Sequence, residues 1–210
     1  MLPWNVAKRG LSSTDPIHTL WRFLGSTWLS TTDEDDMLEM LRARIEADPN
    51  LVGSVRVESA SLSDKLAGVF KERDSVDYEQ SPSTRWLGKH TKQKHWVTLE
   101  FDGVSLVLRY ADSLSDPIPP SLREMLQWWA SKHIPDELRF DFLPTAIQTD
   151  GHSCGMFASN SAEHAVYPMQ TTLMKQEDAT LARLSMFNRI ANRILDRVFS
   201  AFLFLTSARH

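Results

Sequence analysis

Cysteine is nearly absent from this chain of 210 residues, in which Cys154 stands alone. A single cysteine excludes an internal disulfide framework and leaves one candidate thiol nucleophile. The first residues lack the charged and apolar regions of a signal peptide, and the longest apolar stretch, 198–205, is too short to span a bilayer. We therefore expect an intracellular protein of the nucleus or cytoplasm that does not bind membranes.

The chain also lacks a large net charge, internal repeats and low-complexity segments. Its net charge of −4 argues against a general nucleic-acid-binding protein. Hydrophobic residues make up 42% and charged residues 24%, which is close to the average of globular proteins, and the length suits one domain with a sizeable core. We expect an N-terminal arm without regular structure at residues 1–27 and one α+β domain at residues 28–210.

The hydrophobic pattern predicts helices and strands that follow one another along the chain. Residues 31–36 form a cluster of hydroxyl and acidic side chains that is typical of a helix N-terminus, and 48–50 end that helix. The other expected elements are a short strand at 51–57, a helix at 61–71, a surface loop at 72–94, a helix at 120–132, a strand at 138–142, a helix that begins at Cys154, and a long final helix with Leu181, Leu184, Phe187, Ile190, Ile194 and Val198 on its buried face.

A β-hairpin is the clearest local prediction. Apolar and polar residues alternate on both sides of Asp102-Gly103, which predicts a two-residue turn with paired residue numbers that sum to 205. His95 then faces Tyr110, and Asp112 is its diagonal neighbour at about 7 Å between backbones. The pattern therefore predicts a contact between His95 and Asp112 at the open end of the hairpin.

The lone cysteine precedes a run of small and apolar residues, 155–162, that favours a helix. A thiol in the first turn of a helix lies where the macrodipole and the free N–H groups stabilise a thiolate. Gln148, six positions upstream, can stabilise an oxyanion with its side-chain amide if the turn residues Asp150-Gly151 fold it back.

Four side chains together match the requirements of a cysteine protease: Cys154 as nucleophile, His95 as base, Asp112 as the carboxylate that orients the base, and Gln148 as oxyanion donor. Each also has an ordinary structural explanation, such as a buried cysteine in a core helix or a histidine that caps a strand. The predicted pairing of His95 with Asp112, together with a cysteine that opens a helix, favours the catalytic interpretation.

Metal binding is the competing chemistry, because His152, Cys154 and His164 cluster in the sequence. A structural zinc site needs a second cysteine or a closely spaced pair of ligands, and this cluster has neither. We expect no metal site, and no cofactor is implied.

The order and spacing of these residues resemble the ubiquitin-like-protein-specific proteases, the desumoylating enzymes. The resemblance covers residues 28–164 and rests on His95-Trp96, Asp112-Ser113, Gln148 and Ser153-Cys154-Gly155. It implies a papain-like cysteine protease fold, with a small central antiparallel sheet surrounded by helices, and it assigns the same four catalytic roles. It also implies that Trp28 and Trp96 flank a narrow slot for the Gly-Gly tail of the substrate.

By that resemblance the chain is a thiol protease that cleaves after the C-terminal Gly-Gly of a ubiquitin-like modifier, with SUMO the expected one, by deconjugation or precursor processing. Its expected partners are the modifier and its conjugates. Two departures weaken any inference about the modifier: the family often has Asn-Asp where this chain has Ser30-Thr31, and Asp where it has Ser153. Two alternatives stay open, a catalytically silent modifier-binding module and an acyltransferase that uses the same Cys-His-Asp constellation.

Overall fold

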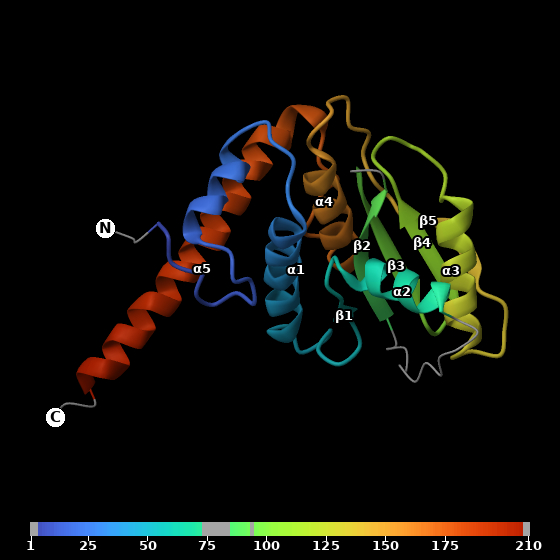
Figure 1. Cartoon of the computed structure of the whole chain (residues 1–210), viewed down its shortest axis with the longest axis horizontal. Helices are drawn as coiled ribbons and strands as arrows, with labels where there is room; N and C mark the ends of the chain where they lie inside the picture. The colour runs from blue at the N-terminus through green and yellow to red at the C-terminus, as the bar shows by residue number, and fades with distance from the viewer. Residues whose placement is uncertain (1–3, 73–84, 93–94, 208–210) are drawn as a thin grey trace.

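The computed structural model describes residues 4–72, 85–92 and 95–207, and for 85–92 and 198–207 it describes the backbone alone (Figure 1). The elements in chain order are η1 (Ile17–Leu24), α1 (Thr31–Glu46), β1 (Arg56–Val57), α2 (Leu62–Lys71), β2 (Arg85–Lys92), β3 (His95–Asp102), β4 (Val107–Ala111), α3 (Pro120–Ser131), β5 (Arg139–Phe142), α4 (Cys154–Val166), η2 (Gln176–Asp178) and α5 (Ala179–Ser207), where η marks a 3₁₀ helix. The predicted helices and the strand at 138–142 are therefore present.

The sheet contains five strands in the order of the sequence. Strands β2, β3 and β4 are antiparallel, as expected for the centre of the sheet, whereas β1 and β5 join its two edges in parallel. The prediction of a surface loop at 72–94 is wrong for residues 85–92, which form β2, and the rest of that loop lies outside the described residues. Pairing with β3 along its whole length outweighs the polar composition of β2.

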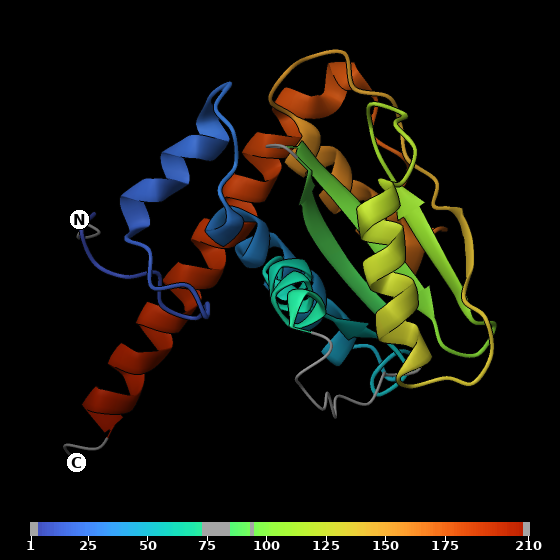
Figure 2. The ribbon, with the colours of Figure 1, turned by 45° about the vertical axis from the view of Figure 1, so that its right-hand side comes forward.

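Helices cover both faces of the sheet (Figures 1 and 2). On one face Val97, Leu99 and Phe101 of β3 are buried in a core shared with α2 and α3. On the other face Trp96 is buried with residues of α1 and α4, and the Thr98 hydroxyl donates a hydrogen bond of 2.7 Å to the Ala158 carbonyl of α4. Side chains alternate between the two faces along β3, so Trp96 and Thr98 hold α4 against one face of the strand that begins with His95.

The hairpin between β3 and β4 differs from its prediction in the turn. Paired residue numbers sum to 209 instead of 205, so a loop of residues 103–106 replaces the two-residue turn. The Asp102 carboxylate accepts hydrogen bonds from the N–H groups of Val104 and Ser105 and from the Ser105 hydroxyl, which stabilises the longer loop. Because the shift is even, the side chains that remain in β3 and β4 keep the faces that the alternation predicted.

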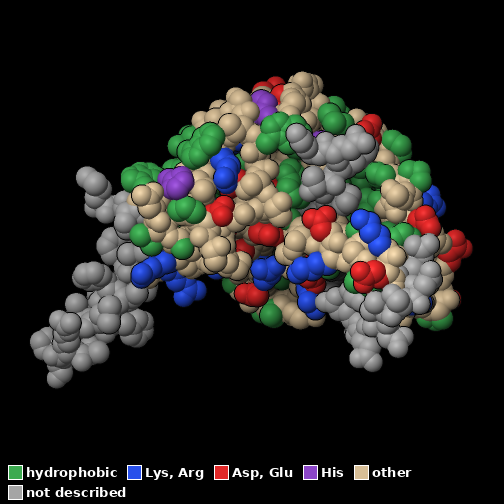
Figure 3. Space-filling view, viewed as in Figure 1, with side chains coloured by type: hydrophobic (Ala, Val, Ile, Leu, Met, Phe, Trp, Pro, Cys, Tyr) green, Lys and Arg blue, Asp and Glu red, His purple; other side chains and the backbone are tan. Residues whose placement is uncertain are grey.

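Residues before Trp28 are more ordered than expected. The prediction of an irregular arm is wrong for η1, where Ile17, Leu20 and Phe23 are buried at the three-residue period of a 3₁₀ helix. These side chains share a core cluster with α4 and α5. Figure 3 shows hydrophobic side chains on the opposite, solvent-facing side of this region, where Trp21 and Leu24 are exposed.

The final helix buries only part of its predicted face: Ile190 and Ile194 are buried as predicted, and the side chain of Val198 lies outside the described residues. Leu181 and Leu184 are exposed, although the pattern placed them on the buried face. The buried positions are Ala179, Arg183, Met186, Ile190 and Ile194. Among the helices in the described part of the chain, including α5 with its 29 residues, none is both long and apolar enough to cross a membrane.

Candidate active site

The loop that leads into α4 is organised by the carboxylate of Asp150. One oxygen accepts hydrogen bonds from the backbone N–H groups of His152 and Ser153, and the other accepts from the Ser153 hydroxyl and the Gln176 side chain. Partial burial would raise the pKa of Asp150, but these hydrogen bonds lower it to about 2. The loop delivers Cys154 as the first residue of α4, in a buried position.

His95 and Asp112 are in contact, as the sequence predicted. The Nε2 atom of His95 lies 2.7 Å from Oδ1 of Asp112. The same carboxylate accepts hydrogen bonds from the backbone N–H of Leu114 and from the Tyr110 hydroxyl. When the observed pairing is continued, Asp112 falls opposite Val97. It is again a diagonal neighbour of His95, because a shift of four in the sum moves it from two positions beyond the residue opposite His95 to two positions before it.

The thiol of Cys154 also interacts with the imidazole of His95 and contributes to its raised pKa. Burial would lower the pKa of His95, but the hydrogen bonds and charges of Asp112 and Cys154 raise it to about 9. Burial would likewise raise the pKa of Asp112, but the hydrogen bonds from His95, Leu114 and Tyr110 lower it. The site therefore favours an imidazolium held between a carboxylate and the lone sulfur.

Gln148 is buried and held by three hydrogen bonds. Its side-chain oxygen accepts from the Ser113 hydroxyl at 2.7 Å, its side-chain nitrogen donates to the Asp150 carbonyl at 2.8 Å, and its backbone N–H donates to the Ser113 carbonyl. An amide nitrogen carries two N–H groups, so one of them is left for another acceptor. Sequence reasoning assigned no role to Ser113, although it belongs to the Asp112-Ser113 element of the resemblance.

The two tryptophans of the expected slot lie in different environments. Trp28 is 44% exposed, whereas Trp96 is 4% exposed and packs in one core cluster with Cys154 and Ala158. The indole N–H of Trp96 donates a hydrogen bond of 3.1 Å to the carbonyl of Leu29. Through the Leu29 carbonyl, Trp96 therefore holds the segment that carries the exposed Trp28.

The first turn of α4 fits tightly against α1 and the residue after Trp28. A Cβ atom placed on Gly155 would collide with a carboxylate oxygen of Glu34 and approach a methyl group of Leu29. The Glu34 side chain is fully buried, so it has little room to move away. Glycine is required here because of close approach and not because of its backbone conformation.

Replacing Gly155 with alanine should therefore destabilise the protein by roughly 1–3 kcal/mol, the usual cost of overpacking a core. Urea unfolding monitored by tryptophan fluorescence measures this change. Gly151→Ala is the matched control, since a Cβ atom added at Gly151 would have no other atom within 4 Å. Equal free energies of unfolding for the two variants would show that the packing around Gly155 is looser than described.

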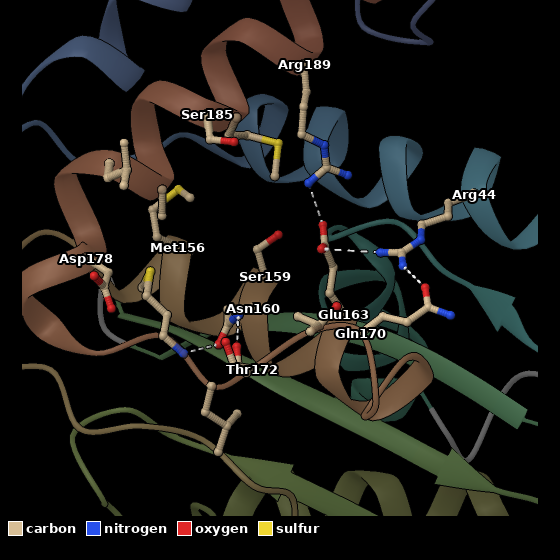
Figure 4. A pocket seen from close by; sticks show the side chains of 16 residues that line it. Arg44, Met156, Ser159, Asn160, Glu163, Gln170, Thr172, Asp178, Ser185 and Arg189 are labelled. Carbon is tan, nitrogen blue, oxygen red and sulfur yellow. Dashed lines mark hydrogen bonds and ion pairs between the residues drawn. The ribbon is translucent and has the colours of Figure 1, made fainter.

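A pocket of about 470 Å³ lies on another face of α4 (Figure 4). Met156, Ser159, Asn160 and Glu163 of α4 line it together with residues of α1, α5 and the segment 170–174. Neither Cys154 nor the other three candidate residues are part of its lining. The pocket is therefore distinct from the candidate active site.

The histidines near Cys154 in the sequence are engaged in other contacts. The ring of His164 hydrogen-bonds the Thr171 carbonyl, and the ring of His152 lies 3.7 Å from the Asp150 carboxylate. Within the part of the chain that the structure describes, no three His, Cys, Asp or Glu side chains are grouped closely enough to hold a metal ion.

The structure is an α+β fold in which Cys154 begins one helix and the His95–Asp112 pair lies at the end of a central hairpin. Neither a scan against protein-family models nor a search of curated proteins finds a match to the sequence. Solved structures do match, and they show that this chain has the fold of the Ulp1-type SUMO protease catalytic domain.

Three solved structures illustrate this similarity. The C-terminal Ulp1 protease domain in complex with Smt3, the yeast ortholog of SUMO, matches with a TM-score of 0.60 and 19% identity over 87% of this chain and 83% of that chain. A de-sumoylating protease matches with a TM-score of 0.69 and 13% identity over 92% and 91%. The Xanthomonas campestris effector XopD bound to ubiquitin matches with a TM-score of 0.51 and 16% identity over 79% and 92%. The expected fold class is confirmed.

Proposed function

We propose that this chain is a thiol protease that cleaves the bond after the C-terminal Gly-Gly of a ubiquitin-like modifier, with SUMO as the preferred modifier. The observation that carries the proposal is the imidazole of His95, which hydrogen-bonds Asp112 and interacts with Cys154, the first residue of a helix. The fold supports it, because the similar structures include a complex with a SUMO ortholog and a complex with ubiquitin.

In the proposed reaction the Cys154 thiolate attacks the carbonyl carbon of the terminal glycine. The side-chain amide of Gln148 stabilises the oxyanion, and the His95 imidazolium gives its proton to the leaving amine. The bond to the amine breaks and a thioester remains. Water, deprotonated by His95, then attacks the thioester and releases the modifier with a free carboxylate, which regenerates the thiolate and the imidazolium.

The proposed tail slot has an exposed wall at Trp28 and an inner wall at Trp96. Trp28 faces solvent one residue before Leu29, whose side chain lies near Gly155, and Trp96 packs in the core with Cys154. A slot between two indoles admits glycine and excludes residues with a Cβ atom. This arrangement would fix the scissile carbonyl at the sulfur.

Reaction with modifiers that carry a C-terminal electrophile tests the proposal. Wild-type protein should form a covalent adduct at Cys154 with SUMO or another member of a panel that includes ubiquitin, and modifiers ending in Gly-Ala should react much more slowly. A protein that alkylates with iodoacetamide but forms no adduct with any member would overturn the proposal. Tight binding without an adduct would identify a silent binding module, and transfer of the modifier to an added amine in place of water would identify an acyltransferase.

The pH profile of turnover should follow His95. Because its raised pKa is about 9, the imidazolium keeps its proton up to that pH, and kcat/KM for a fluorogenic Gly-Gly modifier amide should fall as pH rises through about 9. Asp112→Asn removes one of the groups that raise this pKa, so the alkaline fall should move to lower pH. Rates measured between pH 6 and pH 10 check both expectations.

The same residue gives a stability prediction of definite sign. A group whose pKa is raised on folding stabilises the protein fully below its unfolded pKa, about 6.5 for histidine, and loses that contribution as pH rises through about 9. The free energy of unfolding should therefore decline over this range more steeply in wild type than in Asp112→Asn. Identical pH profiles for the two proteins would mean that the observed contact does not perturb His95.

A further inference from the structure

Arg183 of α5 is a buried cation whose hydrogen bonds reach a distant part of the chain. Only 3% of the residue is exposed. Its Nη2 atom donates to the carbonyl of Arg22 at 2.5 Å and to the carbonyl of Thr27 at 2.7 Å. One guanidinium nitrogen thus binds the last turn of η1, at Arg22, and the residue before Trp28, at Thr27. The Thr27 hydroxyl adds a third contact to the Arg22 carbonyl.

This turn leads directly to the proposed substrate slot. Trp28 follows Thr27, and Leu29 then packs near Gly155 while its carbonyl accepts the hydrogen bond from Trp96. A buried side chain therefore holds the backbone on each side of Trp28: Arg183 binds the carbonyl before it, and Trp96 binds the carbonyl after it. The Trp28 indole itself is 44% exposed, so these backbone contacts fix its position more than side-chain burial does.

The electrostatic surroundings of Arg183 connect it to the same region. Burial lowers the pKa of Arg183, and the charges of Asp150, Glu34, Asp33 and Cys154 act in the opposite direction. A buried guanidinium has a desolvation cost that carbonyl acceptors and nearby carboxylates offset. An apolar residue of similar size would avoid that cost but could not bind the two carbonyls.

We propose that Arg183 is a positioning residue that holds the turn 22–27 through two backbone carbonyls and thereby fixes Trp28 as the outer wall of the tail slot. The role of the turn as a support for the slot rests on the proposed function, whereas the hold of Arg183 on the turn does not. The hold of Arg183 on the turn and the effect of the turn on the slot are therefore measured in separate experiments.

Hydrogen exchange of the free protein tests the hold on the turn. In Arg183→Met, backbone amides of residues 23–30 should exchange at least about tenfold faster than in wild type, because the variant keeps the apolar stem but lacks the donor. Arg193→Met is the matched control: Arg193 lies on the same helix and donates to the Gly10 carbonyl, away from the slot. Unchanged exchange at 23–30, or equal acceleration in the two variants, overturns the proposal whether or not the protein is a protease.

A double-mutant cycle with Trp28 tests the action on the slot. With a fluorogenic SUMO amide ending in Gly-Gly, Arg183→Met should lower kcat/KM by about 10- to 100-fold through misplacement of the tail. In a Trp28→Ala background the same change should cost less than about twofold. Additive effects would assign Arg183 a general structural role and overturn the proposal.

If the Arg183→Met variant does not fold, Arg183→Lys takes its place. Lysine keeps a cationic hydrogen-bond donor, but on a shorter side chain. It should recover part of the exchange protection and part of kcat/KM, in the same proportion. If wild type turns over no modifier substrate, the proposed function fails, and the exchange experiment still decides whether Arg183 holds the turn.

Discussion

Replacing Cys154 with serine should lower turnover of a Gly-Gly-terminated modifier by at least about 10⁴-fold, the scale seen when a protease loses its nucleophile. Cys154 is the chain's single thiol, begins α4 and interacts with the imidazole of His95. A serine hydroxyl has nearly the same size but ionises far less readily, so the attacking anion is lost while the packing is kept. Steady-state rates with a fluorogenic modifier amide give the loss directly.

The same variant should keep its melting temperature within a few degrees and should bind the modifier with unchanged affinity, because its side chain fills the same buried site. Calorimetric titration with the intact modifier measures this binding. Full turnover by the purified serine variant would refute the thiol mechanism. A lost fold would instead show that the sulfur contributes mainly to the core.

Replacing Gln148 with alanine should lower kcat by roughly 10²–10³-fold and leave KM nearly unchanged, as loss of one oxyanion donor does. The Ser113 hydroxyl and the Asp150 carbonyl hold the amide in one orientation before substrate arrives. Such preorganised donors stabilise the transition state more than the bound substrate. Separate determination of kcat and KM distinguishes this role from substrate binding, which would appear in KM alone.

Gln176→Ala provides the control for Gln148. Gln176 supports the same loop by donating to the Asp150 carboxylate and accepting from the Thr149 N–H, but we assign it no contact with substrate. Its replacement should therefore reduce kcat by much less than the loss of Gln148. Similar losses in the two variants would mean that loop order, and not the oxyanion contact, sets the rate.

The contact between His95 and Asp112 was predictable because strand alternation tolerates an even shift in register. The turn was predicted two residues too short, and paired positions moved by four in their sum. An even shift preserves which residues share a face, and a shift of four leaves the carboxylate two positions from the residue opposite His95, so the two remained diagonal neighbours. A shift by an odd number would have placed them on opposite faces and removed the predicted site.

Other features depend on distant contacts that local patterns do not reveal. The polar composition of 85–92 predicted a loop, but pairing with β3 makes it a strand. Leu181 and Leu184 match a helical apolar stripe as well as the true buried positions do. The inward turn of Arg183 is decided by the carbonyls of Arg22 and Thr27, more than 150 residues earlier in the chain.

The core formed by η1 and α5 has a consequence for the order of events during synthesis. The apolar side chains of η1, Ile17, Leu20 and Phe23, are buried only after Ile190 and Ile194 of α5 have been synthesised. Cys154 lies between these two groups in the sequence. Domains generally fold as units during synthesis. A nascent chain that already carries the sulfur, the imidazole and the carboxylate would therefore still lack the fixed turn before Trp28. We expect the ribosome-bound chain to react more slowly with modifiers until α5 has emerged and Arg183 can hold the turn before Trp28.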